Sequence, residues 1–182
     1  GSTMSIAELV ALADRYRPFI GLSGGVTIGG GEPTLQFHEL LSLLVSLKSA
    51  GFHTAVETNG THPDLPSLFE LIDLLYIDLK HPDPSVYDGS GVLSNIRSRF
   101  ESGREMIVRI PLVGGFNADA PFGPVLASVG PLKVEVLPYQ LRGNAKWLAC
   151  GRALPDASLR APSDACVQGV KAELLSFGLE VI

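Results

Sequence analysis

The chain has 182 residues, of which 46% are apolar, 18% charged and 7% aromatic, and this is the composition of an ordinary globular domain rather than of a disordered, collagen-like or disulfide-rich chain. Fourteen Lys and Arg residues against nineteen Asp and Glu residues give a net charge of −5, which provides no basic field for a nucleic acid. No apolar run approaches the roughly 20 residues of a membrane span, and the N-terminal region lacks a signal-peptide pattern. We therefore expect a cytoplasmic protein whose partners include neither a nucleic acid nor a membrane.

The sequence contains two cysteines, Cys150 and Cys166, without CxxC spacing. Two thiols are too few for the three or four thiolates of an iron–sulfur cluster or for a cysteine-ligated zinc site. We expect both to be buried apolar thiols. No histidine stands with others at metal-ligand spacing, so each is expected to have a structural or surface role. The histidines are His38, His53, His62 and His81.

Hydrophobic periodicity predicts helices that alternate with short apolar strands. The first helix is expected to begin at Ile6, with Ser5 and Glu8 as a capping box, and to end at Pro18. Further helices are predicted over residues 35–47, 65–71, 93–102, 125–129 and 166–177. Strands are predicted over residues 25–28, 53–56, 74–77, 106–112, 133–137 and 179–182.

This alternation predicts an α/β fold with a parallel sheet covered by helices. An open barrel and a doubly wound sheet both fit the pattern. The chain shows no internal linker or low-complexity segment, so we expect one domain over residues 3–182, with residues 1–2 as a tag remnant.

The polar and glycine-rich clusters follow the carboxyl ends of strands. They are residues 30–33, 57–60, 78–80, 113–117 together with Arg109, and 137–140. In both candidate architectures this edge of the sheet is where ligands bind. We therefore predict that these clusters form one binding site.

The glycines in the first cluster allow a ligand to approach the backbone closely, and Glu32 could accept hydrogen bonds from an ammonium group. A tight strand-to-helix turn without a ligand is the alternative. Glycine clusters of this kind are a weak signal on their own.

Glu57 and Asp78 end neighbouring predicted strands, where two carboxylates favour a cation between them. With Thr58 as a further oxygen donor, such a site suits Na⁺, K⁺, Mg²⁺ or Ca²⁺. Lys80 and Arg109 are suited to a ligand carboxylate. The alternative is a closed set of ion pairs, Asp78 with Lys80 and Glu57 with Arg109.

Taken together, segments 25–36, 53–60, 73–81, 108–117 and 137–147 resemble the radical SAM activating enzymes of glycyl radical enzymes, of the pyruvate formate-lyase type. The resemblance implies a partial (β/α)6 barrel, truncated at its N-terminus, that binds S-adenosylmethionine (SAM). In the complete family a reduced [4Fe–4S] cluster cleaves SAM, and the 5′-deoxyadenosyl radical removes a hydrogen from a glycine of the partner enzyme. A flavodoxin-like reductant is implied for the full-length form.

The resemblance also implies roles for individual residues. Gly30, Gly31 and Glu32 match the segment that holds the methionyl amino group. The other implied cofactor-binding residues are Thr58, Asn59, Lys80, Arg109 and Gln140. A monovalent cation, Na⁺ or K⁺, is implied at Glu57, Thr58, Asp78 and the Tyr76 carbonyl.

Three departures from the family pattern bear on function. The cluster motif CxxxCxxC, expected before the opening helix, does not occur in the sequence; Gln140 replaces a His after Pro-Tyr; and Gly29 replaces a Ser. The first hypothesis is a fragment of an activase that lacks its cluster segment and is inactive alone. The second is a natural cluster-less pseudoenzyme that binds SAM or another protein, and the third is a barrel of unrelated chemistry that uses the cation site.

Overall fold

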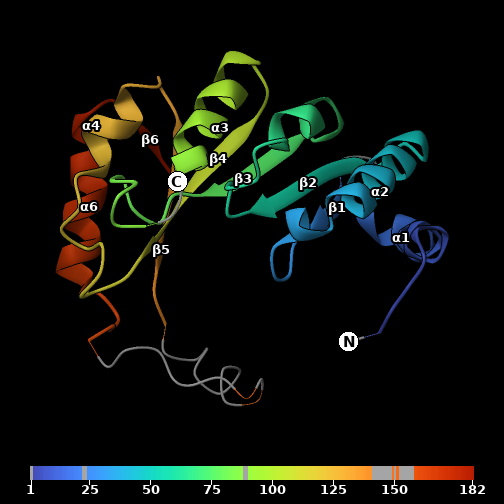
Figure 1. Cartoon of the computed structure of the whole chain (residues 1–182), viewed down its shortest axis with the longest axis horizontal. Helices are drawn as coiled ribbons and strands as arrows, with labels where there is room; N and C mark the ends of the chain where they lie inside the picture. The colour runs from blue at the N-terminus through green and yellow to red at the C-terminus, as the bar shows by residue number, and fades with distance from the viewer. Residues whose placement is uncertain (1, 22–23, 88–89, 141–148, 150, 152–157) are drawn as a thin grey trace. The chain divides into compact units, whose positions relative to one another are not determined.

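The computed structural model describes residues 2–21, 24–87, 90–140, 149, 151 and 158–182. Within these residues six strands form one sheet in chain order, β1-β2-β3-β4-β5-β6 (Figure 1). The pairing is parallel between β1 and β2, between β2 and β3, and between β5 and β6. The prediction of a parallel α/β fold with six strands is confirmed.

The elements follow the predicted order. The strands are β1 Gly25–Ile28, β2 His53–Thr58, β3 Leu74–Asp78, β4 Met106–Leu112, β5 Lys133–Pro138 and β6 Glu180–Val181. The α-helices are α1 Ile6–Ile20, α2 Phe37–Ser49, α3 Ser90–Glu101, α4 Phe122–Ala127 and α6 Asp164–Ser176. Two 3₁₀ helices are also present, η1 Pro33–Gln36 and η2 Leu65–Leu71. The first replaces the start of the helix predicted over residues 35–47, and the second replaces the whole helix predicted over residues 65–71.

The chain divides into two compact units. The first comprises Gly1–Ile77 and Gly91–Ile107, and the second comprises Asp78–Ser90 and Val108–Ile182. None of the helices within the described residues combines the length and apolar character that crossing a membrane requires.

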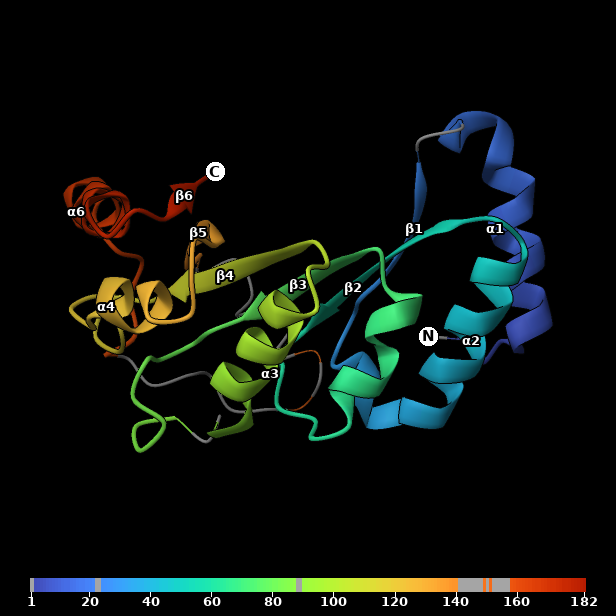
Figure 2. The ribbon, with the colours of Figure 1, turned by 90° about the horizontal axis from the view of Figure 1, so that it is seen from above.

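In the first unit α1 and α2 pack against each other next to β1 and β2 (Figure 2). Helix α2 supplies much of the core through Leu44 and Leu47, which are almost fully buried, and β2 supplies Val56. The apolar period of α2 explains this burial, because residues three and four apart share one face of a helix. Helix α1, by contrast, has no fully buried residue.

The predicted start of α1 is confirmed and its predicted end is wrong. Ser5 Oγ accepts from the Glu8 amide, and a Glu8 carboxylate oxygen accepts from the Ser5 amide at 2.7 Å, which completes the capping box. The helix continues past Pro18 to Ile20. Proline removes only its own N–H bond, and so close to the end of a helix this loss does not stop the last turn.

A buried arginine joins α3 to the end of η2 in the first unit. Arg99 of α3 is fully buried, and its guanidinium donates to the carbonyl oxygens of Phe69 at 2.9 Å, Ile72 at 2.9 Å and Glu105 at 2.8 Å. Burial lowers the pKa of Arg99 to about 10, which leaves it charged at neutral pH. The carbonyl groups at the end of η2 thus obtain donors that no local helix bond provides.

A second polar network ties α2 to the start of β2. Lys48 Nζ lies 2.7 Å from one carboxylate oxygen of Asp73, and the Thr54 amide donates to the other at 2.7 Å. Burial alone would raise the pKa of Asp73, but the hydrogen bonds from Lys48 and Thr54 outweigh it, so the pKa lies below its ordinary value.

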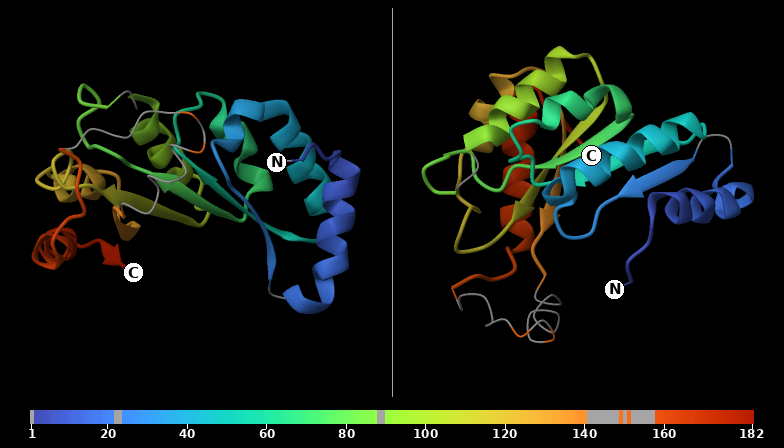
Figure 3. Two further views of the ribbon diagram at one scale, coloured as in Figure 1. Left: turned by 90° about the horizontal axis from the view of Figure 1, so that it is seen from below. Right: turned by 45° about the vertical axis from the view of Figure 1, so that its right-hand side comes forward.

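In the second unit α4 packs against α6, and α6 leads into β6 at the C-terminus (Figures 1 and 3). Ser163 caps α6 by accepting from the Cys166 amide. The prediction of a buried thiol is wrong for Cys166, which is half-buried because it lies in the first turn of α6. Cys150 lies outside the described residues.

Candidate functional site

The Glu32 carboxylate anchors the loop that follows β1. Its Oε1 accepts from the Thr34 amide at 3.1 Å, from the Thr34 hydroxyl at 2.7 Å and from the Thr58 hydroxyl at 2.7 Å. Its Oε2 accepts from the Asn59 amide at 2.7 Å. Glu32 therefore ties the end of β1 to the end of β2, and its carboxylate is engaged by four donors of the protein itself.

The two glycines before Glu32 form an open backbone surface, which we call the glycine floor (Gly30 and Gly31). A Cβ atom added at either position would meet no atom within 4 Å. Gly30 has φ +114°, a conformation that a residue with a side chain rarely adopts. With the Glu32 side chain already occupied, the backbone groups of this floor are the groups of the loop best placed to contact a ligand.

Thr58 and Asn59 shape the turn after β2. Thr58 is 3% exposed; its hydroxyl donates to Glu32 and accepts from the Gly60 amide at 3.1 Å. The Asn59 side-chain oxygen accepts from the Thr61 amide at 2.9 Å. Both side chains hold the turn in place, and their role as cofactor-binding residues stays a prediction.

Glu57 lies opposite Tyr76 in the parallel register of β2 and β3. A Cβ atom added at Gly29 would stand 3.2 Å from Glu57 Oε2, so the end of β1 passes close to this carboxylate. The cation site predicted at Glu57, Thr58, Tyr76 and Asp78 stays a prediction, since its members belong to both units.

In the second unit Asp78 pairs with Arg109 rather than with Lys80. Arg109 Nε lies 3.0 Å from Asp78 Oδ1, and the two side chains are 15% and 21% exposed. The Lys80 ammonium instead lies 3.3 Å from the hydroxyl of Tyr87. The alternative of an Asp78–Lys80 ion pair is wrong: β3 ends at Asp78, so Lys80 lies in the loop beyond the strand, and its ammonium contacts Tyr87. Arg109 comes from β4, where its carbonyl accepts from the Leu79 amide at 2.8 Å.

One residue of this region was not predicted in any cluster: Tyr87 contacts the Lys80 ammonium. Asn117, a member of the predicted cluster 113–117, is buried and donates to the Lys80 carbonyl at 2.7 Å. The sequence signal for Asn117 is its place two residues after Gly115, in the polar and glycine-rich segment that follows β4. Gln140, which was predicted, is exposed beyond the end of β5.

The glycines after β4 contact the protein's own backbone. Gly114 pairs with Arg160 through two backbone hydrogen bonds of 2.9 Å. Gly115 has φ +85°, and a Cβ atom there would collide with the Ser158 carbonyl. Residues 158–161 therefore lie against this segment, and its place in the predicted binding site stays a prediction.

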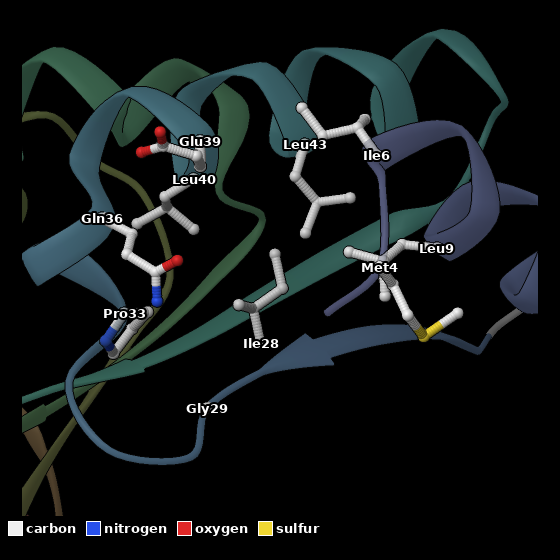
Figure 4. Close-up of a pocket in the computed structure, with 10 residues that line it drawn as sticks. All are labelled: Met4, Ile6, Leu9, Ile28, Gly29, Pro33, Gln36, Glu39, Leu40 and Leu43. Carbon is white, nitrogen blue, oxygen red and sulfur yellow. The ribbon is translucent and has the colours of Figure 1, made fainter. Parts of the chain in front are cut away.

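A cavity of about 230 Å³ lies in the first unit between α1, α2 and the end of β1 (Figure 4). Its lining is mostly apolar, with Gln36 and Glu39 as polar members. The other lining residues are Met4, Ile6, Leu9, Ile28, Gly29, Pro33, Leu40 and Leu43. The glycine floor does not line it, and no local pattern predicted it because its walls come from separate segments.

The described residues contain no group of three or more His, Cys, Asp or Glu side chains arranged to hold a metal ion. His62 stacks on Phe37, with ring centroids 4.4 Å apart, and its Nδ1 accepts from the Asp64 amide. His81 Nδ1 accepts from the Asp83 amide at 3.0 Å.

Comparison with known proteins gives one consistent result. The chain is 30% identical to the choline trimethylamine-lyase activating enzyme of Oleidesulfovibrio alaskensis, across all of this chain and 64% of that protein. It is 28% identical to the pyruvate formate-lyase 1-activating enzyme of Escherichia coli K12, across all of this chain and 80% of that enzyme. The chain thus spans slightly less than two thirds of the first relative.

Solved structures and family models agree with these relatives. The crystal structure of a domain of a pyruvate-formate lyase-activating enzyme from Bacteroides vulgatus superposes with a TM-score of 0.70 and 27% identity, over 88% of this chain and 98% of that one. The family model described as Radical SAM superfamily matches residues 1–119. Since this match extends over well over half of the sequence, the chain belongs to the Radical SAM superfamily.

Proposed function

We propose that this chain is the SAM-binding part of an activating enzyme for a glycyl radical enzyme. The observation that carries the proposal is the open glycine floor at the end of β1, next to the Glu32 carboxylate that fixes this loop. The chain belongs to the Radical SAM superfamily, and its curated relatives are named as such activating enzymes. We propose that the backbone carbonyl groups of this floor accept hydrogen bonds from the ammonium group of the ligand.

Two sets of groups suit the methionyl end of SAM by their chemistry. The carbonyl oxygens of Gly30 and Gly31 would accept from its ammonium, and Lys80 and Arg109 are cations suited to its carboxylate. In a complete activating enzyme, SAM together with a reduced cluster would supply the 5′-deoxyadenosyl radical that removes a hydrogen atom from a glycine of the partner. The chain's own residues bind and orient the methionyl end.

The donor set of this chain does not fit a [4Fe–4S] cluster. The sequence supplies two cysteines, whereas a cluster takes three or four thiolates. The described residues provide no alternative group of His, Cys, Asp and Glu. We therefore propose that these 182 residues bind SAM without cleaving it on their own.

The proposal includes the partners and ions that accompany this activity. The macromolecular partner is a glycyl radical enzyme of the pyruvate formate-lyase kind, and a full-length form would receive its electron from a flavodoxin-like reductant in the cytoplasm. A Na⁺ or K⁺ ion at Glu57, Thr58, Asp78 and the Tyr76 carbonyl would offset the charge of the two carboxylates.

Calorimetric titration of the chain with SAM tests the proposal. We expect SAM to bind, and Gly31→Ala to weaken binding about tenfold or more, because its methyl group occupies space that a ligand contacts. Gly169→Ala is the matched control: it lies in α6, also faces open space, and should leave SAM affinity unchanged.

Each outcome of the titration bears on a different part of the proposal. Absence of SAM binding in both Na⁺ and K⁺ buffers would overturn the proposed function. Equal affinity of Gly31→Ala and the unmodified chain would show that the glycine floor is not the contact. Equal affinity in Na⁺, K⁺ and tetramethylammonium buffers would remove the cation site.

A further inference from the structure

The Lys80 side chain is held at its ammonium end by one residue of the loop after β3. Lys80 Nζ lies 3.3 Å from the Tyr87 hydroxyl and 5.4 Å from the centroid of the Tyr87 ring. A hydroxyl oxygen accepts from an ammonium, and the face of an aromatic ring attracts the same charge. Tyr87 thus restrains a side chain whose four carbons would otherwise sample many rotamers.

The backbone of Lys80 is fixed as well. Asn117 is 1% exposed and donates through Nδ2 to the Lys80 carbonyl at 2.7 Å and to the Pro111 carbonyl at 2.8 Å. Its Oδ1 accepts from the Val113 amide at 2.7 Å. The turn that ends β4 therefore holds Lys80 at a set position within the second unit.

The loop that carries Tyr87 is itself ordered by local bonds. Asp83 Oδ1 accepts from the Ser85 amide at 2.8 Å and from the Ser85 hydroxyl at 2.7 Å. The Tyr87 ring packs edge-on against Phe116, with centroids 6.4 Å apart. Because Phe116 precedes Asn117 in the chain, the groups that fix Lys80 at both ends come from one packed assembly.

We propose that Tyr87 is a positioning residue that holds the Lys80 ammonium in place for a ligand carboxylate. The inference rests on the proposed function, in which that carboxylate belongs to the methionyl end of SAM. A lysine held in place before binding loses less side-chain freedom when the carboxylate arrives. The Tyr87 hydroxyl acts through Lys80 and has no contact of its own with the ligand.

A pair of ligands isolates this role from a general effect on folding. SAM and decarboxylated SAM share the sulfonium, the amino group and the nucleoside, and only SAM has the carboxylate. We expect Tyr87→Phe to weaken SAM binding about fivefold, the contribution of one ordinary hydrogen bond, and to leave decarboxylated SAM unaffected. Lys80→Met should reduce the preference for SAM to what Arg109 alone provides, and Tyr87→Phe added to Lys80→Met should then change neither affinity.

Tyr16→Phe is the matched control, because it makes the same chemical change at an exposed tyrosine of α1 in the other unit. It should bind both ligands as the unmodified chain does. Thermal unfolding of each variant checks that the fold is retained, and Tyr87→Phe keeps the ring that packs on Phe116.

The outcomes separate this inference from the proposed function. If the unmodified chain binds no SAM, both fail. If Lys80→Met reduces the preference for SAM and Tyr87→Phe leaves that preference unchanged, Tyr87 has no positioning role and only the inference fails. Equal weakening of both ligands by Tyr87→Phe would show a merely structural role, and tighter SAM binding would show that Tyr87 holds Lys80 away from the ligand.

Discussion

Glu32→Gln tests whether the carboxylate at the end of β1 serves the protein or the ligand. The substitution keeps the size of the side chain and replaces one carboxylate oxygen by an NH₂ group. If the amide oxygen takes the Oε1 position, its NH₂ group faces the Asn59 amide, which is a donor at 2.7 Å from Oε2 in the present structure. If it takes the other orientation, three donors from Thr34 and Thr58 lose their acceptor.

The expected loss of stability follows from these contacts. One hydrogen bond to a charged acceptor contributes about 2 kcal/mol, and each of the remaining three becomes a weaker bond between neutral groups. Because Glu32 is half-buried, solvent reduces these effects, and we expect Glu32→Gln to lower the free energy of unfolding by about 3 kcal/mol in total.

Urea unfolding followed by circular dichroism measures this loss. Glu101→Gln, at an exposed glutamate at the end of α3, is the control and should change stability little. SAM titration of the same variants supplies the second measurement. Undiminished stability of Glu32→Gln together with a large loss of SAM affinity would refute the reasoning, because the carboxylate would then contact the ligand ammonium directly.

Three further predictions concern the scaffold. The pKa of Asp73 lies below its ordinary value in the folded state, so its carboxylate with Lys48 stabilises the fold above the unfolded-state pKa, and this contribution is lost as pH falls through the folded-state pKa. In urea unfolding between pH 7 and pH 3, the free energy of unfolding of Asp73→Asn should therefore depend less on pH than that of the unmodified chain. Equal pH dependence of the two proteins would contradict this. Arg99→Leu should lower stability by about 3 kcal/mol or more by leaving buried carbonyl groups without donors, and a change below about 1 kcal/mol would show that water replaces the guanidinium. Gly115→Ala should destabilise by about 2 kcal/mol because of its positive φ and the nearby Ser158 carbonyl, and wild-type unfolding midpoints would show that residues 158–161 move aside without cost.

Local patterns predicted the elements well where the physical signal is local. The capping box of Ser5 and Glu8 was recognisable because both partners lie within one helical turn. The apolar run of β4 gave the bounds Met106–Leu112 without error. The passage of α1 through Pro18 was missed because one lost hydrogen bond near a helix end is a small cost against continued packing.

The contacts of the candidate site depended on partners far apart in the sequence. Glu32 was assigned to a ligand ammonium, since its sequence context does not reveal Thr58 and Asn59 as donors. The pairing of Asp78 with Arg109 joins residues from β3 and β4, and the contact of Lys80 with Tyr87 depends on a loop. Composition and periodicity carry no information about such pairs.

The bonds of Glu32 also bear on how fast a ligand would associate. The loop after β1 is fixed to the end of β2 by bonds that form when the chain folds, so its backbone has its final shape before any ligand is present. Encounter then requires no prior ordering of this segment, and substitutions on the glycine floor should alter the lifetime of the complex more than its rate of formation.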